Sequence, residues 1–251
     1  MALFECSHRS DAIDKRMQFN VIIPDSFSGG ELPCLYLLHG LYDDYTMWQR
    51  MTGVERYANE RGLAVVMPDG GKSFYTDMKY GYRYFSYVSD EIVAYTRKVF
   101  PLSCEREKTF VAGNSMGGYG AFKLALAKPD MFGAAVSFSG ALHLEAWNER
   151  GLWDPDAVNI WGEDGFGKIA GSENDLFYLA KRAAASAKEL PRLYQICGTE
   201  DFLYSDNVKF RDFVSALPYD YKYDEMPGSH NWGFWDANLA RAMDYLLEKD
   251  K

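Results

Sequence analysis

The sequence has few cysteines, no long apolar run and no excess of positive charge. Its four cysteines are widely spaced, without a C-x-x-C pair or a nearby histidine arrangement that would indicate zinc. We expect no metal site, and we expect Cys34 and Cys197, which lie in apolar runs, to be buried free thiols. No stretch reaches the roughly 18 apolar residues of a membrane span. A membrane protein is therefore not expected.

The charge balance of the chain limits the classes of molecule that it is expected to bind. A formal net charge of −9 and a pI near 5.0 leave no basic face for nucleic acid or an anionic membrane. Charged residues are scattered through the first twenty positions, where a signal peptide would need an apolar stretch. Together with the cysteine usage, this predicts a cytoplasmic protein. Glycine and proline are spread evenly and no repeat appears, so we expect residues 1–251 to form a single domain.

Short apolar runs alternate with stretches of helical spacing. The runs predict strands at 19–23, 34–38, 63–67, 109–112, 134–138, 192–197 and 219–225. The helical stretches are 46–60, 90–99, 118–127, 176–187, 208–216 and 237–248. Alternation of this kind implies right-handed crossovers and a mostly parallel sheet with helices on both faces. The predicted class is α/β.

Two segments break the alternation. The runs at 17–24 and 34–40 are joined by the turn-rich DSFSGGELP, which favours an antiparallel hairpin at the N-terminal edge of the sheet. The region 142–174 is rich in glycine and acidic residues and has little periodicity, so we interpret it as an insertion over one end of the sheet. Its aromatic side chains are compatible with a homo-oligomer, and they include Trp147, Trp153 and Trp161.

Residues 113–117 read GNSMG and fit the pattern G-x-S-x-G. Ser115 stands between a predicted strand and a predicted helix, which is the setting of a nucleophile elbow. Side chains at 113 and 117 would collide with the neighbouring strand and helix, which explains the glycines. The turn also leaves the Met116 N–H free to donate to a developing oxyanion. The alternative is a small-residue turn that happens to contain a serine.

A serine hydroxyl becomes a useful nucleophile only when a positioned base takes its proton, and that base is normally a histidine held by a carboxylate. The chain has four histidines. His8 lies in a polar N-terminal segment and His143 in the insertion, so we expect surface roles for both. His230 lies between the predicted last strand and the final helix, and we expect it to be the base.

The acid is expected in ICGTEDFLY, directly after the predicted strand 192–197. Asp201 is the first candidate and Glu200 the alternative. The chain order Ser115, Asp201, His230 is the order typical of an α/β-hydrolase, with the acid after a late strand and the base after the final one.

Loops at the same end of the sheet supply candidate binding groups. His39 ends an early strand, and we expect it to shape the loop whose Leu41 N–H is the second oxyanion donor. We also expect His39 and Trp232 to contribute to substrate binding, since aromatic faces near the site suit a sugar ring or a cinnamoyl group. A strongly anionic substrate is disfavoured by the acidic loop residues Asp43, Asp44 and Asp69.

Several motifs in a fixed order resemble one family. LLHGL, MPDGG, SFYTDM, GNSMGGYGAFKLAL, GTEDFLY and the final H-x-W are similar to the esterase D and feruloyl esterase-like α/β-hydrolases, from about residue 15 to 245. Within that group the chain looks most like small bacterial tributyrin (acyl) esterases. The resemblance implies an α/β-hydrolase fold and a serine carboxylesterase without a cofactor. It also implies the triad Ser115, Asp201 and His230, with Leu41 and Met116 as oxyanion donors.

The resemblance leaves the substrate open. Members of the family act on short acyl esters, on acetylated or feruloylated polysaccharide fragments, or on S-formylglutathione. The last substrate fits less well, because those enzymes carry a cysteine in the loop where this sequence has LYDDYTMWQR. A small-molecule or oligosaccharide ester is therefore the expected partner. The remaining alternatives are acyl transfer to an alcohol and a non-catalytic binding protein on the same fold.

Overall fold

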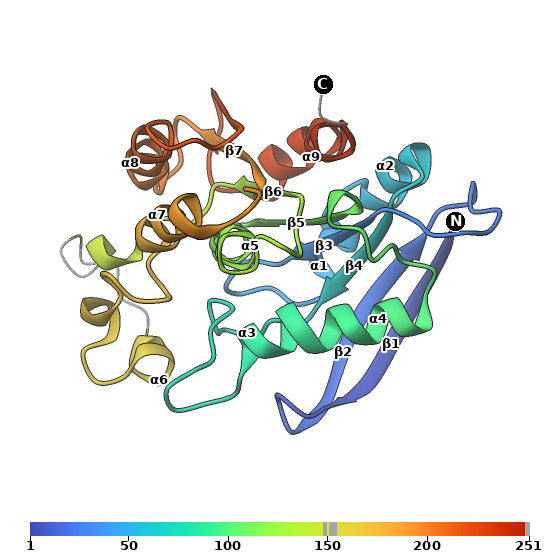
Figure 1. The fold of residues 1–251 in the computed structure, drawn as a ribbon, viewed down its shortest axis with the longest axis horizontal. Coiled ribbons are helices and arrows are strands. Elements are labelled where there is room, and N and C mark those ends of the chain that lie inside the picture. Colours follow the sequence, from blue (N-terminus) through green and yellow to red (C-terminus); the bar gives the residue numbers. More distant parts are fainter. Residues whose placement is uncertain (148–149, 151–154, 249–251) are drawn as a thin grey trace.

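A computed structural model describes residues 1–147, 150 and 155–248. Within these residues an eight-stranded mixed sheet has the order β1-β2-β4-β3-β5-β6-β7-β8 (Figure 1). In chain order the strands are β1 (Ala2–Ser10), β2 (Lys15–Ile23), β3 (Cys34–Leu38), β4 (Ala64–Pro68), β5 (Thr109–Asn114), β6 (Ala134–Phe138), β7 (Arg192–Gly198) and β8 (Tyr221–Met226). The strands from β4 to β8 are mutually parallel. The α/β-hydrolase fold with an antiparallel N-terminal edge is confirmed.

The composition of that edge differs from the prediction. β2 pairs antiparallel with β1 and with β4, so the expected hairpin between β2 and β3 is wrong. β3 is buried along its whole length between β4 and β5, and it has no free edge for β2. β1 was not predicted from the sequence, because most of its side chains are polar or exposed and form no apolar run.

Helices cover both faces of the sheet (Figure 1). Helices α1, α2 and α9 pack on one face, whereas α4, α5, α7 and α8 pack on the other. The helices are α1 (Met47–Met51), α2 (Val54–Arg61), α3 (Tyr84–Ser86), α4 (Val93–Val99), α5 (Met116–Ala127), α6 (Ala157–Trp161), α7 (Leu176–Ser186), α8 (Tyr204–Val214) and α9 (Trp232–Leu247). Shorter turns are a π-helix, η1 (Tyr87–Ile92), and the 3₁₀ helices η2 (Arg106–Lys108), η3 (Leu144–Trp147) and η4 (Gly165–Lys168). Among the described helices none is long and apolar enough to cross a membrane.

Several helix boundaries differ from the predicted ones: α5 begins at Met116 instead of 118, α8 begins at Tyr204 instead of 208, and the stretch 90–99 is divided between η1 and α4. Two further differences concern the first and the last helix. The helix expected over 46–60 is interrupted at Gly53 and forms α1 and α2. The final helix begins at Trp232 instead of near 237, because the Asn231 side chain caps it by accepting from the Phe234 N–H at 3.0 Å. The helix therefore starts two residues after His230.

The described part of the insertion, η3, α6 and η4, packs against the loop that follows β4. The Lys79 N–H donates to the Ile160 carbonyl at 2.9 Å, and the Phe74 ring lies 5.2 Å from that of Trp161. In Figure 1 this yellow segment lies beside α3 and α7. Trp153, one of the three tryptophans expected here, lies outside the described residues.

Two histidines expected at the surface are buried instead. The His8 ring stacks on Tyr95 with centroids 4.7 Å apart, since β1 carries it under α4. His143 packs edge-on against Phe177 at 5.2 Å. The burial expected for the thiols is confirmed at Cys34 and Cys197, and burial raises the pKa of Cys34 to about 12. The Cys34 thiol is consequently a packing group and a poor nucleophile at neutral pH.

Candidate active site

Ser115 stands on a strained turn between β5 and α5. Its backbone angles are φ 55° and ψ −116°, a region that costs a non-glycine residue about 1–3 kcal/mol. Neighbouring backbone holds the turn in place, because the Ser115 N–H donates to the Phe138 carbonyl at 2.9 Å and the Ala141 N–H donates to the Ser115 carbonyl at 3.2 Å. The side chain is thereby presented at the carboxyl edge of the sheet, where parallel strands place their functional loops.

Three glycines make that turn sterically possible. A Cβ at Gly113 would stand 2.4 Å from the Gly117 carbonyl oxygen, and one at Gly117 would stand 2.3 Å from the Leu38 carbonyl oxygen. A Cβ at Gly118 would meet the Ser137 hydroxyl at 2.6 Å. β5 and α5 can approach β3 and β6 this closely only because none of the three positions carries a side chain.

Asp201 and His230 form a hydrogen-bonded pair close to this turn. His230 Nδ1 lies 3.0 and 2.9 Å from the two carboxylate oxygens of Asp201, whose side chain is fully buried. The Leu203 N–H also donates to Asp201 Oδ1, at 2.8 Å, which fixes the carboxylate. With the Nδ1 proton donated to Asp201, Nε2 is the nitrogen left to accept a proton from the cavity side.

Glu200, the alternative acid, points elsewhere. Its carboxylate accepts from the Gly228 N–H and, at 2.8 Å, from the Thr199 hydroxyl, and the side chain is exposed. The structure thus brings Asp201, and not Glu200, to His230.

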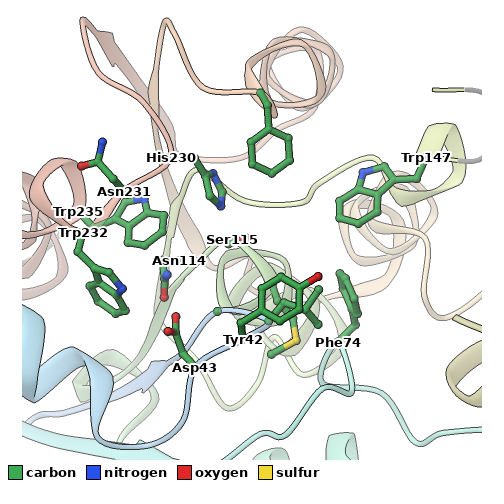
Figure 2. A pocket seen from close by; sticks show the side chains of 14 residues that line it. Tyr42, Asp43, Phe74, Asn114, Ser115, Trp147, His230, Asn231, Trp232 and Trp235 are labelled. Carbon is green, nitrogen blue, oxygen red and sulfur yellow. The ribbon is translucent and has the colours of Figure 1, made fainter. Parts of the chain in front are cut away.

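Ser115 and His230 face one cavity of about 660 Å³ (Figure 2). In Figure 2 the imidazole of His230 points into the space above Ser115. The rings of Phe202 and Trp235 lie 4.6 and 5.1 Å from the imidazole and restrict its orientation. The cavity is lined by Gly40, Leu41, Tyr42, Asp43, Phe74, Asn114, Ser115, Met116, Trp147, Phe202, His230, Asn231, Trp232 and Trp235.

Leu41 and Met116, the two expected oxyanion donors, both line this cavity. Met116 is the first residue of α5, so its N–H has no partner within the helix. Over the described part of the chain, neither the Leu41 nor the Met116 N–H donates to another backbone carbonyl. Both backbone groups are therefore free to bind an oxygen atom.

His39 is buried behind the loop that carries Leu41, outside the cavity lining. Its Nδ1 lies 2.8 Å from the Gly40 carbonyl oxygen, and its Nε2 accepts from the Gly70 N–H at 2.8 Å. The Tyr75 hydroxyl donates to the His39 carbonyl at 3.0 Å. These bonds hold the backbone from 39 to 41. Trp232 does line the cavity, packed edge-on against Trp48 at 5.1 Å.

Phe74, Phe202 and Asn114 also line the cavity, and their place there was not predicted from the sequence. Phe74 and its neighbour Tyr75 both have φ near 48°, so the SFYTDM segment turns sharply to place the Phe74 ring. Phe202 directly follows Asp201. Position beside a catalytic motif was the available signal for Phe202 and for Asn114, which precedes Ser115.

A buried lysine joins α5 to the loops around the cavity. Lys123 Nζ donates to the Thr76 hydroxyl at 2.7 Å and to the Asn174 side-chain oxygen at 2.6 Å. The side chain is 3% exposed, and burial lowers the pKa of Lys123 to about 7. On the same helix the Tyr119 hydroxyl donates to the Asn174 carbonyl at 2.8 Å. Helix α5, which directly follows Ser115, therefore anchors the end of the insertion.

Residues 10–246 match the family model described as "Putative esterase". An acetyl esterase from Caldicellulosiruptor saccharolyticus is 32% identical over 242 residues, covering 94% of this chain and 89% of the relative.

Two solved structures from Staphylococcus aureus are also similar. One is FphF, a fluorophosphonate-binding serine hydrolase with bound substrate, at 36% identity and a TM-score of 0.91, with 99% of both chains covered. The other is an S-formylglutathione hydrolase (FrmB) without ligand, at 36% identity and a TM-score of 0.88, covering 98% of this chain and 99% of that one.

Proposed function

The chain belongs to the esterase family of α/β-hydrolases and is a carboxylic ester hydrolase, and we propose that it hydrolyses short-chain acyl esters through an acyl-enzyme intermediate on Ser115. One observation carries the proposal: Ser115 occupies a strained turn and faces the same cavity as His230, whose imidazole is hydrogen-bonded to Asp201. An activated serine needs that arrangement of nucleophile, base and orienting acid.

The proposed reaction has two halves. His230 Nε2 takes the Ser115 proton as the hydroxyl oxygen attacks the ester carbonyl, and the same proton passes to the departing alcohol. Water then attacks the acyl-enzyme in the same way and releases the acid. Asp201 fixes the imidazole orientation and stabilises the imidazolium formed in each half.

Charge develops on the carbonyl oxygen in both halves. The N–H groups of Leu41 and Met116 are the proposed donors to this oxyanion, and one such donor contributes about 3 kcal/mol to lowering the barrier. Because both are backbone groups held by β3 and α5, they need no rearrangement during the reaction.

Two observations support a short acyl group. The cavity of about 660 Å³ must hold both the acyl and the alcohol part of the substrate, and bulky aromatic side chains restrict it. The relative at 32% identity is named an acetyl esterase. Both observations favour a substrate with a small acyl group.

S-formylglutathione is the second candidate substrate. One solved structure at 36% identity is named an S-formylglutathione hydrolase, which favours this substrate. In addition, formyl is the smallest acyl group, so it agrees with the small acyl group proposed above. The loop LYDDYTMWQR, which has no cysteine, counts against it. Hydrolysis of this thioester would use the same serine, base and acid, so only the choice of substrate separates the two candidates.

Replacing the nucleophile tests the proposed mechanism. The wild type should hydrolyse p-nitrophenyl acetate and butyrate and react with a fluorophosphonate probe. Ser115→Ala should lower kcat by about 10⁶-fold and abolish labelling. Ser186→Ala, which removes an exposed serine hydroxyl on α7, is the matched control and should keep both properties. Labelling of Ser115→Ala at the wild-type rate would overturn the assignment.

A substrate panel separates the candidates. Acetyl, butyryl, octanoyl and feruloyl esters, acetylated xylo-oligosaccharide and S-formylglutathione should be compared by kcat/KM. The proposal expects acetyl or butyryl esters to be preferred. A kcat/KM for S-formylglutathione well above all oxygen esters would instead support the second candidate.

A further inference from the structure

Three aspartates lie on loops at the active-site end of the sheet, and their carboxylates have different surroundings. Asp44 is exposed and accepts from the Thr46 N–H at 2.8 Å and the Thr46 hydroxyl at 2.6 Å. Asp69 accepts from the Gly71 N–H at 2.9 Å and does not line the cavity. Asp43 alone among the three lines the cavity, and its side chain is half-buried.

The Asp43 carboxylate lies close to the reacting serine. A Cβ built on Gly40 would stand 3.0 Å from Asp43 Oδ2, 3.1 Å from Asn114 Nδ2 and 3.7 Å from Ser115 Cβ. All three atoms therefore surround one point beside Gly40, in the loop that carries Leu41. Figure 2 shows the side chains of Asp43 and Asn114 facing one another below His230, on the side of the cavity that carries Trp232.

Asn114 is fully buried, and neither its side-chain nitrogen nor its oxygen has a hydrogen-bond partner of good geometry among the described residues. A buried amide without partners costs about 1–3 kcal/mol. Its nearness to Asp43 offsets part of that cost, since the amide favours the charged carboxylate. Asn114 is thus a positioning group for Asp43.

The Asp43 carboxylate forms no ion pair with a lysine or arginine within the described ranges, and Lys72, whose ammonium lies 5.5 Å from the Tyr42 ring centroid, pairs with Asp156. His39 favours the charged carboxylate but lies outside the cavity lining, so no cationic side chain meets Asp43 from the cavity among the residues that line it. Burial raises the pKa of the Asp43 carboxyl, which reflects the cost of holding this charge away from water. A group on a bound substrate could supply the missing partner.

We propose that Asp43 determines specificity, favouring esters that carry a cationic or hydroxyl group close to the ester carbonyl and disfavouring esters that carry a carboxylate there. The inference rests on the proposed hydrolysis at Ser115. The favoured group can belong to the acyl part or to the alcohol part of the substrate, because the recognising chemistry is the same for both.

Pairs of esters with matched shapes separate these two sources. For the alcohol part, acetylcholine is compared with its neutral isostere 3,3-dimethylbutyl acetate. For the acyl part, ethyl 3-aminopropanoate is compared with ethyl butyrate. In the wild type the cationic ester should have the higher kcat/KM in at least one pair. Ethyl hydrogen succinate, which carries a carboxylate, should be hydrolysed more slowly than ethyl butyrate.

Asp43→Asn removes the charge and keeps the shape. In the pair that shows the preference, the ratio of kcat/KM for the cationic ester to that for the neutral one should fall about ten-fold, which corresponds to about 1.4 kcal/mol. The ratio of kcat/KM for ethyl hydrogen succinate to kcat/KM for ethyl butyrate should rise by a similar factor. Asp44→Asn removes the same charge one residue away, outside the cavity, and should change neither ratio more than about two-fold.

Three outcomes would overturn the inference. The first is a wild type without a cationic preference in either pair, which needs no variant to measure. The second is an Asp43→Asn variant that slows all esters equally, since that would indicate a structural role in the loop. The third is an equal shift of the ratios in Asp44→Asn. If Ser115→Ala still abolishes hydrolysis, any of these outcomes removes the role of Asp43 and leaves the proposed esterase function in place.

Discussion

The two walls of the active-site cavity are built in different ways. The wall that carries Ser115 and His230 is fixed by backbone: strand ends, close-packed glycines and a carboxylate held by an N–H. The opposite wall consists of side chains, with Phe74 from the loop after β4 and Trp147 from the insertion, packed edge-on at 5.8 Å. In the proposed mechanism, reactivity therefore depends on backbone geometry, whereas the fit of the substrate depends on the packing of two loops.

The largest expected effect concerns the backbone-fixed wall. Asp201→Asn should lower kcat for p-nitrophenyl acetate by about 10⁴-fold, because an amide at this position favours the wrong imidazole tautomer. Glu200→Gln is the matched control. It should lower kcat only a few-fold, since Glu200 bonds Gly228 and not His230. The opposite ranking of the two variants would transfer the acid to Glu200.

The second-largest expected effect concerns Lys123, which connects α5, behind the wall with Ser115, to Thr76 and Asn174 in the loops of the opposite wall. Its pKa of about 7 in the folded protein is below the value of 10.5 for a free lysine side chain. Between these values the unfolded chain binds a proton that the folded protein does not. The free energy of unfolding should therefore rise with pH by about 1.4 kcal/mol per unit from this group between about pH 7 and 10, and level off below pH 7.

Lys123→Met should remove that slope, as measured by urea unfolding at several pH values. Lys128→Met, which removes a lysine just after α5 and breaks its ion pair with Asp90 of η1, is the control and should keep the slope. An equal slope in wild type and Lys123→Met would show that Lys123 does not titrate in this range.

The smallest expected effect concerns the side-chain wall. Trp147→Ala should enlarge the cavity on the insertion side, and the ratio of kcat/KM for octanoyl to acetyl ester should rise about ten-fold, about 1.4 kcal/mol. Trp161→Ala disturbs the same aromatic cluster from a position outside the cavity lining and serves as the control. A similar change in both variants would mean that general loosening, and not lost contact with the acyl chain, sets the chain-length preference.

The placement of Ser115, Asp201 and His230 at one edge of the sheet could be predicted from the sequence, because it depends on local features. Ser115 directly follows β5, Asp201 and His230 lie in the loops after β7 and β8, and parallel strands bring their carboxyl ends to one edge. The choice of Asp201 over Glu200 required the structure, because it depends on how one turn directs two adjacent side chains.

The other wall could not be predicted. Phe74 and Trp147 meet through packing between segments more than seventy positions apart, and no periodicity encodes such a contact. The same applies to His8 and His143, which we expected at the surface because His8 lies in a polar segment and His143 in the insertion. The pairing of β2 also went wrong for a non-local reason: β4, far along the chain, inserts between β2 and β3.

The glycines at 113, 117 and 118 have a consequence for how this enzyme can diversify. Because each lies against atoms of another strand or of the turn itself, a substitution there requires compensating changes in separate segments, and single mutations cannot supply them. After random mutagenesis, active variants should keep glycine at these positions, whereas Tyr42, which is exposed at the cavity, should accept many residues. New substrate preferences can therefore arise at the rim one mutation at a time, around a reaction centre that is inherited unaltered.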